Sequence, residues 1–230
     1  MRALRHGYTN RTVGDGAVVE KTYDGPDAAA RLRCERALLP RLRGRVPVPP
    51  LLRADDHTLT LGFAPGVPGQ ELLDAGHAEE VLRSCGEVLR RVHATPADVL
   101  EAEADHAGGG AGRTDHVLVH GDFGPHNALF DPSSFQVTAV VDWEFAHLGD
   151  PVEDLAWCEW IIRMHHPEHV DALGDFYDAY GGTAPTWSTR RAAMLAKCAW
   201  YREFCQRWDP SGPGVRQWEE RAGITGAWQE

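Results

Sequence analysis

Three oxygen-bearing side chains stand at the ends of predicted strands and could together serve a phosphoryl-transfer reaction. Asp122 follows the apolar run 117–119 across a glycine turn, and Asn127 comes five residues later. Asp142 ends the β-branched run 137–141, which an Asp-Pro-Ser-Ser turn folds back beside Asn127. Metal-assisted transfer needs a base that reaches the acceptor hydroxyl and two ligands for the cation that bridges the phosphates. The ordered set indicates this chemistry more strongly than any one acid, because isolated loop acids are usually solvated.

A lysine and a glutamate in the N-terminal part complete the set. The chain holds only two lysines, Lys21 and Lys197, among 23 basic residues. A strand is predicted over 17–23 after a Gly-Asp-Gly turn, and its alternation puts Lys21 on a face with apolar neighbours. The helix predicted from 25–27 up to Gly44 carries Glu35 on its apolar stripe. A buried, unpaired carboxylate is costly, so we expect Glu35 to pair with Lys21. The alternatives are an arginine partner for Glu35 and a solvated Lys21 at a strand end.

Composition narrows the class of partner. The formal net charge of −11 disfavours nucleic acid and anionic membranes as partners and favours cationic ligands. The five cysteines show no C-x-x-C spacing, which predicts neither a disulfide framework nor a zinc site and fits the cytoplasm. The first residues lack the apolar segment of a signal peptide, and no apolar run is long enough to span a membrane.

The periodic patterns divide the chain into two parts. Residues 1–63 are predicted to form a nucleotide-binding lobe with a small antiparallel sheet and one helix, and residues 64–230 a mainly helical lobe. The segment 64–69, rich in proline and glycine, is interpreted as a hinge or as a plain loop. With a hinge there, backbone groups around 61–63 are expected to be free to bind a flat heterocycle. Other predicted segments are helices over 77–94, 170–180 and 190–207, a helix beginning at 149–151, and a mobile loop over 101–116.

The motifs resemble those of a known superfamily. The stretch His120-Gly121-Asp122-Phe123-Gly124-Pro125-His126-Asn127 resembles the catalytic loop of the aminoglycoside phosphotransferase and choline kinase-like superfamily, relatives of the protein kinases. Asp142-Trp143-Glu144 is similar to its metal-binding triplet. The segment 149–156 resembles the place where the family has an acid that supports the catalytic loop. The resemblance covers about Gly7 to Trp208 and implies an α+β, bilobal, protein kinase-like fold.

The resemblance also implies roles for individual residues. Asp122 is implied as the catalytic base, with Asn127 and Asp142 as ligands of Mg²⁺. Lys21 is implied to contact the α- and β-phosphates of ATP or GTP and to pair with Glu35. The other residues assigned to the nucleotide site are Gly7, Asn10, Leu61 and Phe63. The residues assigned as supports of the catalytic loop are His120 and Asp154.

Two loop features carry weaker signals. The turn from Gly7 to Asn10 could lay backbone N–H groups over phosphates, and a plain surface turn is the alternative. His126 lies inside the catalytic-loop stretch without an assigned role and is interpreted as a solvent-facing histidine.

The leading functional hypothesis is a kinase that uses ATP or GTP to phosphorylate a hydroxyl of an aminoglycoside or similar antibiotic. The acidic charge balance favours a cationic acceptor. Two alternatives remain: a kinase for a metabolite such as choline, homoserine or a sugar, and an inactive nucleotide-binding regulatory module. No motif selects the substrate-binding acids among those of the helical lobe, whose candidates are Glu144, Glu159, Asp175, Asp178 and Glu203.

Overall fold

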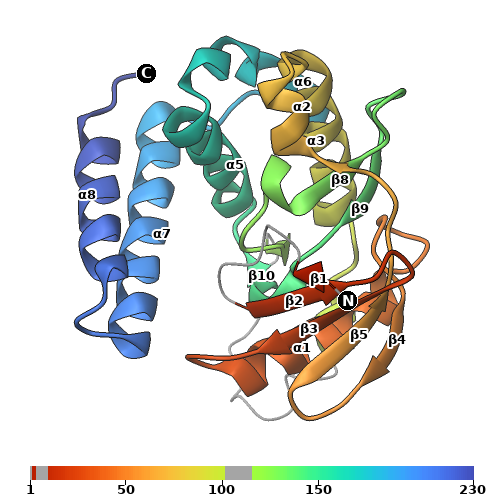
Figure 1. Ribbon diagram of the computed structural model, residues 1–230. Coiled ribbons are helices and arrows are strands. Elements are labelled where there is room, and N and C mark those ends of the chain that lie inside the picture. Colours follow the sequence, from red (N-terminus) through yellow and green to blue (C-terminus); the bar gives the residue numbers. More distant parts are fainter. Residues whose placement is uncertain (1, 4–9, 102–115) are drawn as a thin grey trace.

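An antiparallel sheet forms one end of the molecule and helices form the other (Figure 1). The computed structural model describes residues 2–3, 10–101 and 116–230. Gly7 and most of the loop predicted over 101–116 lie outside these residues. The sheet has the strand order β1-β2-β3-β5-β4. Its strands are β1 Arg2–Ala3, β2 Asn10–Gly14, β3 Val18–Tyr23, β4 Leu51–Ala54 and β5 Thr58–Gly62.

The turn between β2 and β3 is the predicted Gly-Asp-Gly turn. The Asp15 carboxylate accepts hydrogen bonds from the backbone N–H groups of Ala17 and Val18, both at 2.9 Å. Gly16 has a φ of 91°, a left-handed conformation that glycine adopts without strain. Because β3 lies between β2 and β5, Lys21 stands in the middle of the sheet, and its side chain is buried.

The helix α1, Ala28–Leu42, packs against the sheet and against the 3₁₀ turn η3, Trp143–Phe145. Its start after 25–27 and its end before Gly44 confirm the predicted bounds. Glu35 is 1% exposed on the buried face, as the apolar stripe predicted. The buried residues of this helix are Arg31, Leu32, Glu35, Leu38, Leu39 and Leu42.

Short strands hold the segment that carries the predicted chemistry. The strand β8, Ala128–Phe130, pairs antiparallel with β9, Val137–Val140, which confirms the predicted hairpin. A second pair joins β7, Val117–Val119, to β10, His147–Gly149. The strand β6, Val67–Pro68, adds to β8, and the turn η2, Pro125–Asn127, precedes it. The strands β4, β6 and β10 were not predicted from the sequence.

Helices form the rest of the described chain. The predicted helix over 77–94 is α3, and the one over 190–207 is α7, which begins three residues earlier. The helix predicted over 170–180 begins inside a 3₁₀ segment, η4, and continues as α6. The C-terminal α8, which was not predicted, packs against α7 (Figure 1). The bounds are α2 Gly69–Asp74, α3 Ala78–His93, α4 Asp98–Glu101, α5 Val152–His165, η4 Pro167–Ala172, α6 Leu173–Tyr180, α7 Trp187–Trp208 and α8 Pro213–Ala227.

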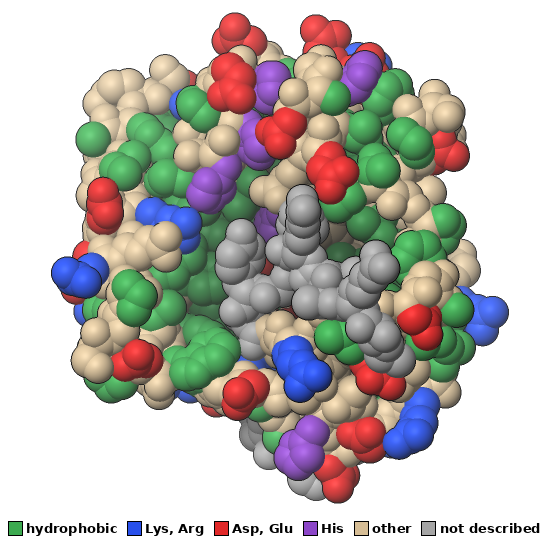
Figure 2. Space-filling view, in the orientation of Figure 1, with side chains coloured by type: hydrophobic (Ala, Val, Ile, Leu, Met, Phe, Trp, Pro, Cys, Tyr) green, Lys and Arg blue, Asp and Glu red, His purple; other side chains and the backbone are tan. Residues whose placement is uncertain are grey.

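Two hydrophobic clusters form the core. The larger joins α1 and the sheet to α3 and α6. The smaller is aromatic and joins α5, α7 and α8, where Trp157 stacks on Trp160 with ring centroids 4.4 Å apart and Tyr201 stacks on Trp218 at 4.5 Å. Figure 2 shows a recess with mostly hydrophobic walls between the α5 and α7 side of the molecule and its middle.

The architecture is the predicted small antiparallel sheet with one helix, followed by a mainly helical region. The division at residues 63 and 64 stays a prediction. All five cysteines are free thiols. Within the described ranges, every helix is too short or too polar to cross a bilayer.

Candidate active site

Asp154 fixes the backbone of the loop that carries Asp122. Its fully buried carboxylate accepts hydrogen bonds from the backbone N–H of His120 at 2.7 Å and of Gly121 at 2.9 Å. His93 Nε2 lies 3.2 Å from the same carboxylate. Burial raises the pKa of a carboxyl, but these hydrogen bonds and His93 outweigh it and lower the pKa of Asp154. Asp154 is therefore ionised and stands where a loop-supporting acid was predicted.

His120 is held as a neutral imidazole under the loop. Its Nε2 lies 3.0 Å from the carbonyl oxygen of Val141 and must donate, whereas its Nδ1 lies 3.2 Å from the N–H of Asp122 and must accept. Burial lowers the pKa of His120, which agrees with this neutral form. His120 thereby ties the Asp122 backbone to the end of β9.

The Asp122 carboxylate is surrounded by hydrogen-bond donors. Its Oδ1 accepts from Trp157 Nε1 at 2.8 Å and from the Tyr201 hydroxyl at 2.9 Å. Its Oδ2 accepts from Asn127 Nδ2 at 3.1 Å. The Nε2 atom of His126 lies 3.6 Å from Oδ1. Trp157 comes from α5 and Tyr201 from α7, so two helices and the loop together position this carboxylate.

These surroundings keep Asp122 ionised. Burial acts to raise the pKa of the carboxyl, but His126 and Lys197 outweigh it and hold the pKa well below its usual range. Two aromatic donors fix one carboxylate oxygen, which restricts how the group can rotate. Asp122 is thus a fixed carboxylate at neutral pH, the state required of a residue that orients or deprotonates a hydroxyl.

Lys21 lies among three carboxylates. Its Nζ is 2.5 Å from Glu35 and 3.4 Å from Glu144, and it also pairs with Asp142. Burial alone would lower the pKa of Lys21, but the three carboxylates raise it well above its usual range. The pair of Lys21 with Glu35 is the one predicted from the sequence. The Tyr23 hydroxyl also donates to Glu35, at the same oxygen that Lys21 contacts.

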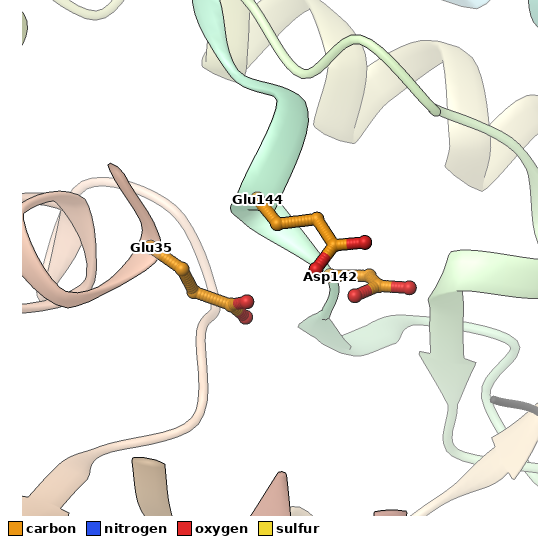
Figure 3. Close-up of side chains that lie close together, drawn as sticks. All are labelled: Glu35, Asp142 and Glu144. Carbon is orange, nitrogen blue, oxygen red and sulfur yellow. The ribbon is translucent and has the colours of Figure 1, made fainter. Parts of the chain in front are cut away.

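The three carboxylates form an acidic cluster that joins α1 to the segment after β9 (Figure 3). One oxygen from each of Glu35, Asp142 and Glu144 lies within 4.8 Å of the others, a spacing that could hold a cation. Asp142 is the accessible member, with 24% of its side chain exposed against 1% for Glu35 and none for Glu144. Asn127, the other predicted metal ligand, lines the same cavity as Asp142.

That cavity, which we call the nucleotide-side cavity, has a volume of about 370 Å³. Its polar end holds Lys21, Asn127 and Asp142, and apolar side chains form its walls. The predicted nucleotide-site residues Asn10, Glu35, Leu61 and Phe63 also line it. An apolar slot with a charged end suits a flat base joined to a phosphate chain. The wall residues are Val19, Pro49, Leu61, Leu129 and Val141.

The prediction of free backbone groups at 61–63 is wrong for two N–H groups. The N–H of Gly62 donates to the carbonyl of Pro50 at 2.8 Å, and the N–H of Phe63 donates to the carbonyl of Ala17 at 2.9 Å. Both donors are therefore already used to hold the end of β5. Leu61 and Phe63 nevertheless line the nucleotide-side cavity.

Two of the predicted substrate acids are buried and neutralised by ion pairs. Glu144 is 3% exposed and contacts Arg31 at 3.1 Å and Asn10 at 2.5 Å besides Lys21. Glu159 is fully buried and contacts Arg190 at 2.5 Å. Each of these carboxylates holds helices or lobes together, and their assignment to substrate stays a prediction. Sequence showed the acids but not the arginines that face them.

The other three predicted substrate acids lie away from the site. Asp175 on α6 pairs with Arg83 at 2.6 Å, and Asp178 is exposed on the same helix. Glu203 is exposed on α7. None of them lines the nucleotide-side cavity or a second cavity, which is lined by Lys197 and Trp200 among other residues. The structure therefore does not bring the five acids together.

His126 has 21% of its side chain exposed and also faces the site, which adds to the interpretation from the sequence. It contacts Asp122 and lines the nucleotide-side cavity, and its Nδ1 is buried without a hydrogen-bond partner among the described residues. Trp157, Tyr201 and Lys197 were not predicted as neighbours of Asp122, and the rarity of lysine was the one signal for Lys197.

Comparison with known families gives a match over most of the chain. The model of the phosphotransferase enzyme family matches residues 1–114 and 101–193. A viomycin phosphotransferase from Streptomyces vinaceus is 34% identical over 89 residues, which are 38% of this chain and 30% of that protein. Acyl-CoA dehydrogenase family member 10 from Mus musculus is 40% identical over 62 residues, 27% of this chain. The matched stretch spans only 6% of that relative's length.

Solved structures share the fold over nearly the whole chain. The GDP complex of aminoglycoside 2'-phosphotransferase-IIIa has a TM-score of 0.75 and 16% identity, covering 98% of this chain and 92% of that one. Macrolide 2'-phosphotransferase MphH from Brachybacterium faecium has a TM-score of 0.64 and 21% identity, covering 100% and 93%. At such identities the likeness shows the fold, and it confirms the predicted kinase-like α+β architecture.

Proposed function

The chain belongs to the phosphotransferase enzyme family, and from this premise we propose that it transfers the γ-phosphate of ATP or GTP to a hydroxyl of a small molecule. The observation that carries the proposal is Asp122, a fixed and ionised carboxylate beside Asn127 at the edge of the nucleotide-side cavity. A carboxylate in that state can accept the hydroxyl proton as the phosphoryl group is transferred.

The nucleotide-side cavity supports the assignment of the nucleotide. Its apolar walls suit a base, and Lys21, held by Glu35, presents an ammonium at the end where phosphates would lie. Structures with GDP are known for a protein of the same fold. Asn10 lines the cavity, and its carboxamide contacts Glu144 and Arg31, which fixes the start of β2.

The residues present fit Mg²⁺ as a cofactor. Asp142 and Asn127 offer a carboxylate and a carboxamide oxygen, the hard oxygen donors that Mg²⁺ prefers. Asp142 pairs with the Lys21 ammonium, so its position already accommodates a positive charge. We assign Asn127 and Asp142 as the residues that would hold Mg²⁺. When bound, the ion would neutralise charge on the transferred phosphate.

Residues under the loop act as supports in this proposal. Asp154 fixes two consecutive backbone N–H groups, and His120 connects the loop to Val141. Both are buried, so they act by holding Asp122 at a set position.

Two acceptor classes follow from different observations. The printed names of the relatives favour an antibiotic hydroxyl, since one is a viomycin phosphotransferase and the structural neighbours act on aminoglycosides and macrolides. The metabolite alternative is favoured by the placement of the predicted acids, which do not form an acidic surface beside Asp122.

The test is the variant Asp122→Asn, with the exposed Asp56→Asn as its control. We expect Asp122→Asn to lower phosphoryl transfer by at least about 10²-fold, the scale of a lost general base, because the amide cannot accept the proton. Nucleotide binding should change no more than a few-fold. Transfer is measured as nucleoside diphosphate release across a panel of antibiotics and hydroxy metabolites, and binding by calorimetry.

Turnover close to that of the wild type in Asp122→Asn would refute the proposed role. Nucleotide binding by the wild type without transfer to any acceptor or to water would instead support the regulatory-module alternative.

A further inference from the structure

Lys197 on α7 lies against aromatic rings and forms no ion pair with the described residues. Its Nζ lies over the ring of Trp200 at 4.5 Å and over that of Tyr201 at 5.0 Å, with Phe145 and Trp157 at 5.7 and 5.9 Å. Among the described residues, no carboxylate oxygen comes within 4.0 Å of this atom. Aromatic faces attract an ammonium but do not cancel its charge.

A second cavity of about 530 Å³, which we call the α7 cavity, is lined by Lys197, Trp200 and Phe145. It shares no lining residue with the nucleotide-side cavity. Gly121, which precedes Asp122, also lines it. Tyr201, four residues after Lys197, donates its hydroxyl to Asp122. The α7 cavity therefore lies next to the proposed catalytic residue, Asp122. The nucleotide-side cavity is lined by His126 and Asn127, which also contact Asp122.

The charged groups that line the α7 cavity differ in whether they have a partner. Glu153 is the acid that lines it, and its carboxylate lies 3.0 Å from His147 Nε2. Lys197 forms no ion pair with the described residues: burial lowers its pKa, and Asp122, Asp154 and Glu153 raise it from a distance. A bound carboxylate in contact with Lys197 would stabilise the buried ammonium, whereas a polycation would be repelled by it.

We propose that the α7 cavity binds the acceptor and that Lys197 pairs with a carboxylate of that acceptor. The acceptor class is then a small hydroxy acid. A monoanion matches a single ammonium better than a phosphate ester, which carries close to two charges at neutral pH. The aromatic walls would cover the carbon chain of such a compound and exclude water from the ion pair. This inference rests on the proposed phosphoryl transfer.

The first experiment measures binding without catalysis. Hydroxy acids of graded length and their primary amides are titrated into the nucleotide-free wild type, Lys197→Met and Arg216→Met, with binding followed by calorimetry and saturation-transfer NMR. Arg216 is exposed on α8 and serves as the matched control for loss of a cation. We expect at least one acid to bind about tenfold or more tightly than its amide, a difference near 1.4 kcal/mol. Lys197→Met should abolish this preference, and Arg216→Met should keep it.

A second variant keeps the test valid if Lys197→Met does not fold. Glu153→Gln removes the negative charge that faces the cavity and should tighten binding of the acid. Equal binding of acids and amides, or tighter binding of aminoglycosides than of acids, would overturn the inference. The same holds if Lys197→Met folds and keeps the acid preference.

The kinase assay separates this inference from the proposed function. If an acid binds in a Lys197-dependent manner but no acceptor is phosphorylated, the proposed function fails and the anion site stands. If antibiotics are phosphorylated and no hydroxy acid binds, the acceptor inference fails and the proposed function stands.

Discussion

The buried network around Glu159 gives a prediction whose size follows from its contacts. Glu159 is fully buried and lies 2.5 Å from Arg190 and 2.7 Å from Arg163, and it accepts a hydrogen bond from the Tyr177 hydroxyl at 2.6 Å. In Glu159→Gln the shape is kept and the charge is lost. Arg190, a residue that is 6% exposed, would keep the carbonyl of Pro185 and the carboxylate of Glu230, whose side chain is 68% exposed.

Removing one partner of a buried ion pair costs about 3–5 kcal/mol, because the other charge stays buried without compensation. For a chain of this size each kcal/mol shifts the melting temperature by about 2–4 °C, so we expect a loss of about 6–20 °C. Urea unfolding followed by far-UV circular dichroism measures the free energy of unfolding directly.

Two comparisons isolate the ion pair. Glu203→Gln, on the exposed face of α7, should change stability by less than about 0.5 kcal/mol. The double variant Glu159→Gln with Arg190→Met should lose less than Glu159→Gln alone, because the buried Arg190 charge is then removed together with its partner. A loss below about 1 kcal/mol in Glu159→Gln would refute this reasoning, and a raised KM for the acceptor without loss of stability would support the substrate role predicted from the sequence.

Two further predictions concern packing and pH. Gly86→Ala should destabilise the protein by about 1–3 kcal/mol, because the added Cβ would lie 2.2 Å from the carbonyl oxygen of Phe176. Gly223→Ala in α8, where an added Cβ meets nothing within 4 Å, should stabilise the protein by about 0.5–1 kcal/mol. Equal effects of the two variants on the free energy of unfolding in urea would contradict this prediction. Glu153 raises the pKa of His147 in the folded state. The contribution of this pair to stability is therefore complete below about pH 6.5, the pKa of an unfolded histidine, and is lost as the pH rises through the higher pKa of the folded state. In Glu153→Gln the NMR titration midpoint of His147 should fall, and an unchanged midpoint would show that the hydrogen bond has no such effect.

Prediction from the sequence succeeded where the hydrophobic pattern and the chemical requirement of a side chain indicate the same structure. The hairpin of β8 and β9 follows from two apolar runs around an Asp-Pro-Ser-Ser turn, and the pair of Lys21 with Glu35 follows from a carboxylate on an apolar stripe. Both depend on local rules plus one requirement, that a buried charge must find a partner. The same requirement applied to Glu159 and Glu144 would have indicated ion pairs. Arg163 lies four positions after Glu159, a local spacing, but the buried partners Arg190 and Arg31 lie 31 and 113 positions from Glu159 and Glu144, where no local pattern identifies them.

Elements without a strong pattern were missed. The strand β10 has three residues and gains its order from pairing with β7, which local propensity does not show. The helix α8 contains Gly214, Gly223 and Gly226, which lower its helix propensity, and only Trp218 and Thr225 are buried. Its stability comes from packing against α7, a tertiary contact.

The neighbours of Asp122 show a further limit of pattern reading. Trp157 and Tyr201 belong to the aromatic cluster, as their helical spacing indicates, yet each also turns one polar atom toward the carboxylate. A residue can therefore serve the core with its ring and the site with its N–H or O–H. Helical periodicity predicts the role of these rings in the core but gives no information on their hydrogen bonds to Asp122.

The scarcity of lysine gives this chain a natural two-site label. Lys21 lines the nucleotide-side cavity and Lys197 lines the α7 cavity, and the sequence contains no other lysine. Reductive methylation with ¹³C-formaldehyde modifies amines alone, so the side-chain resonances of the labelled protein come from these two positions, beside that of the α-amino group. Each resonance reports on one cavity, which lets occupancy on the two sides of Asp122 be followed separately in a single spectrum.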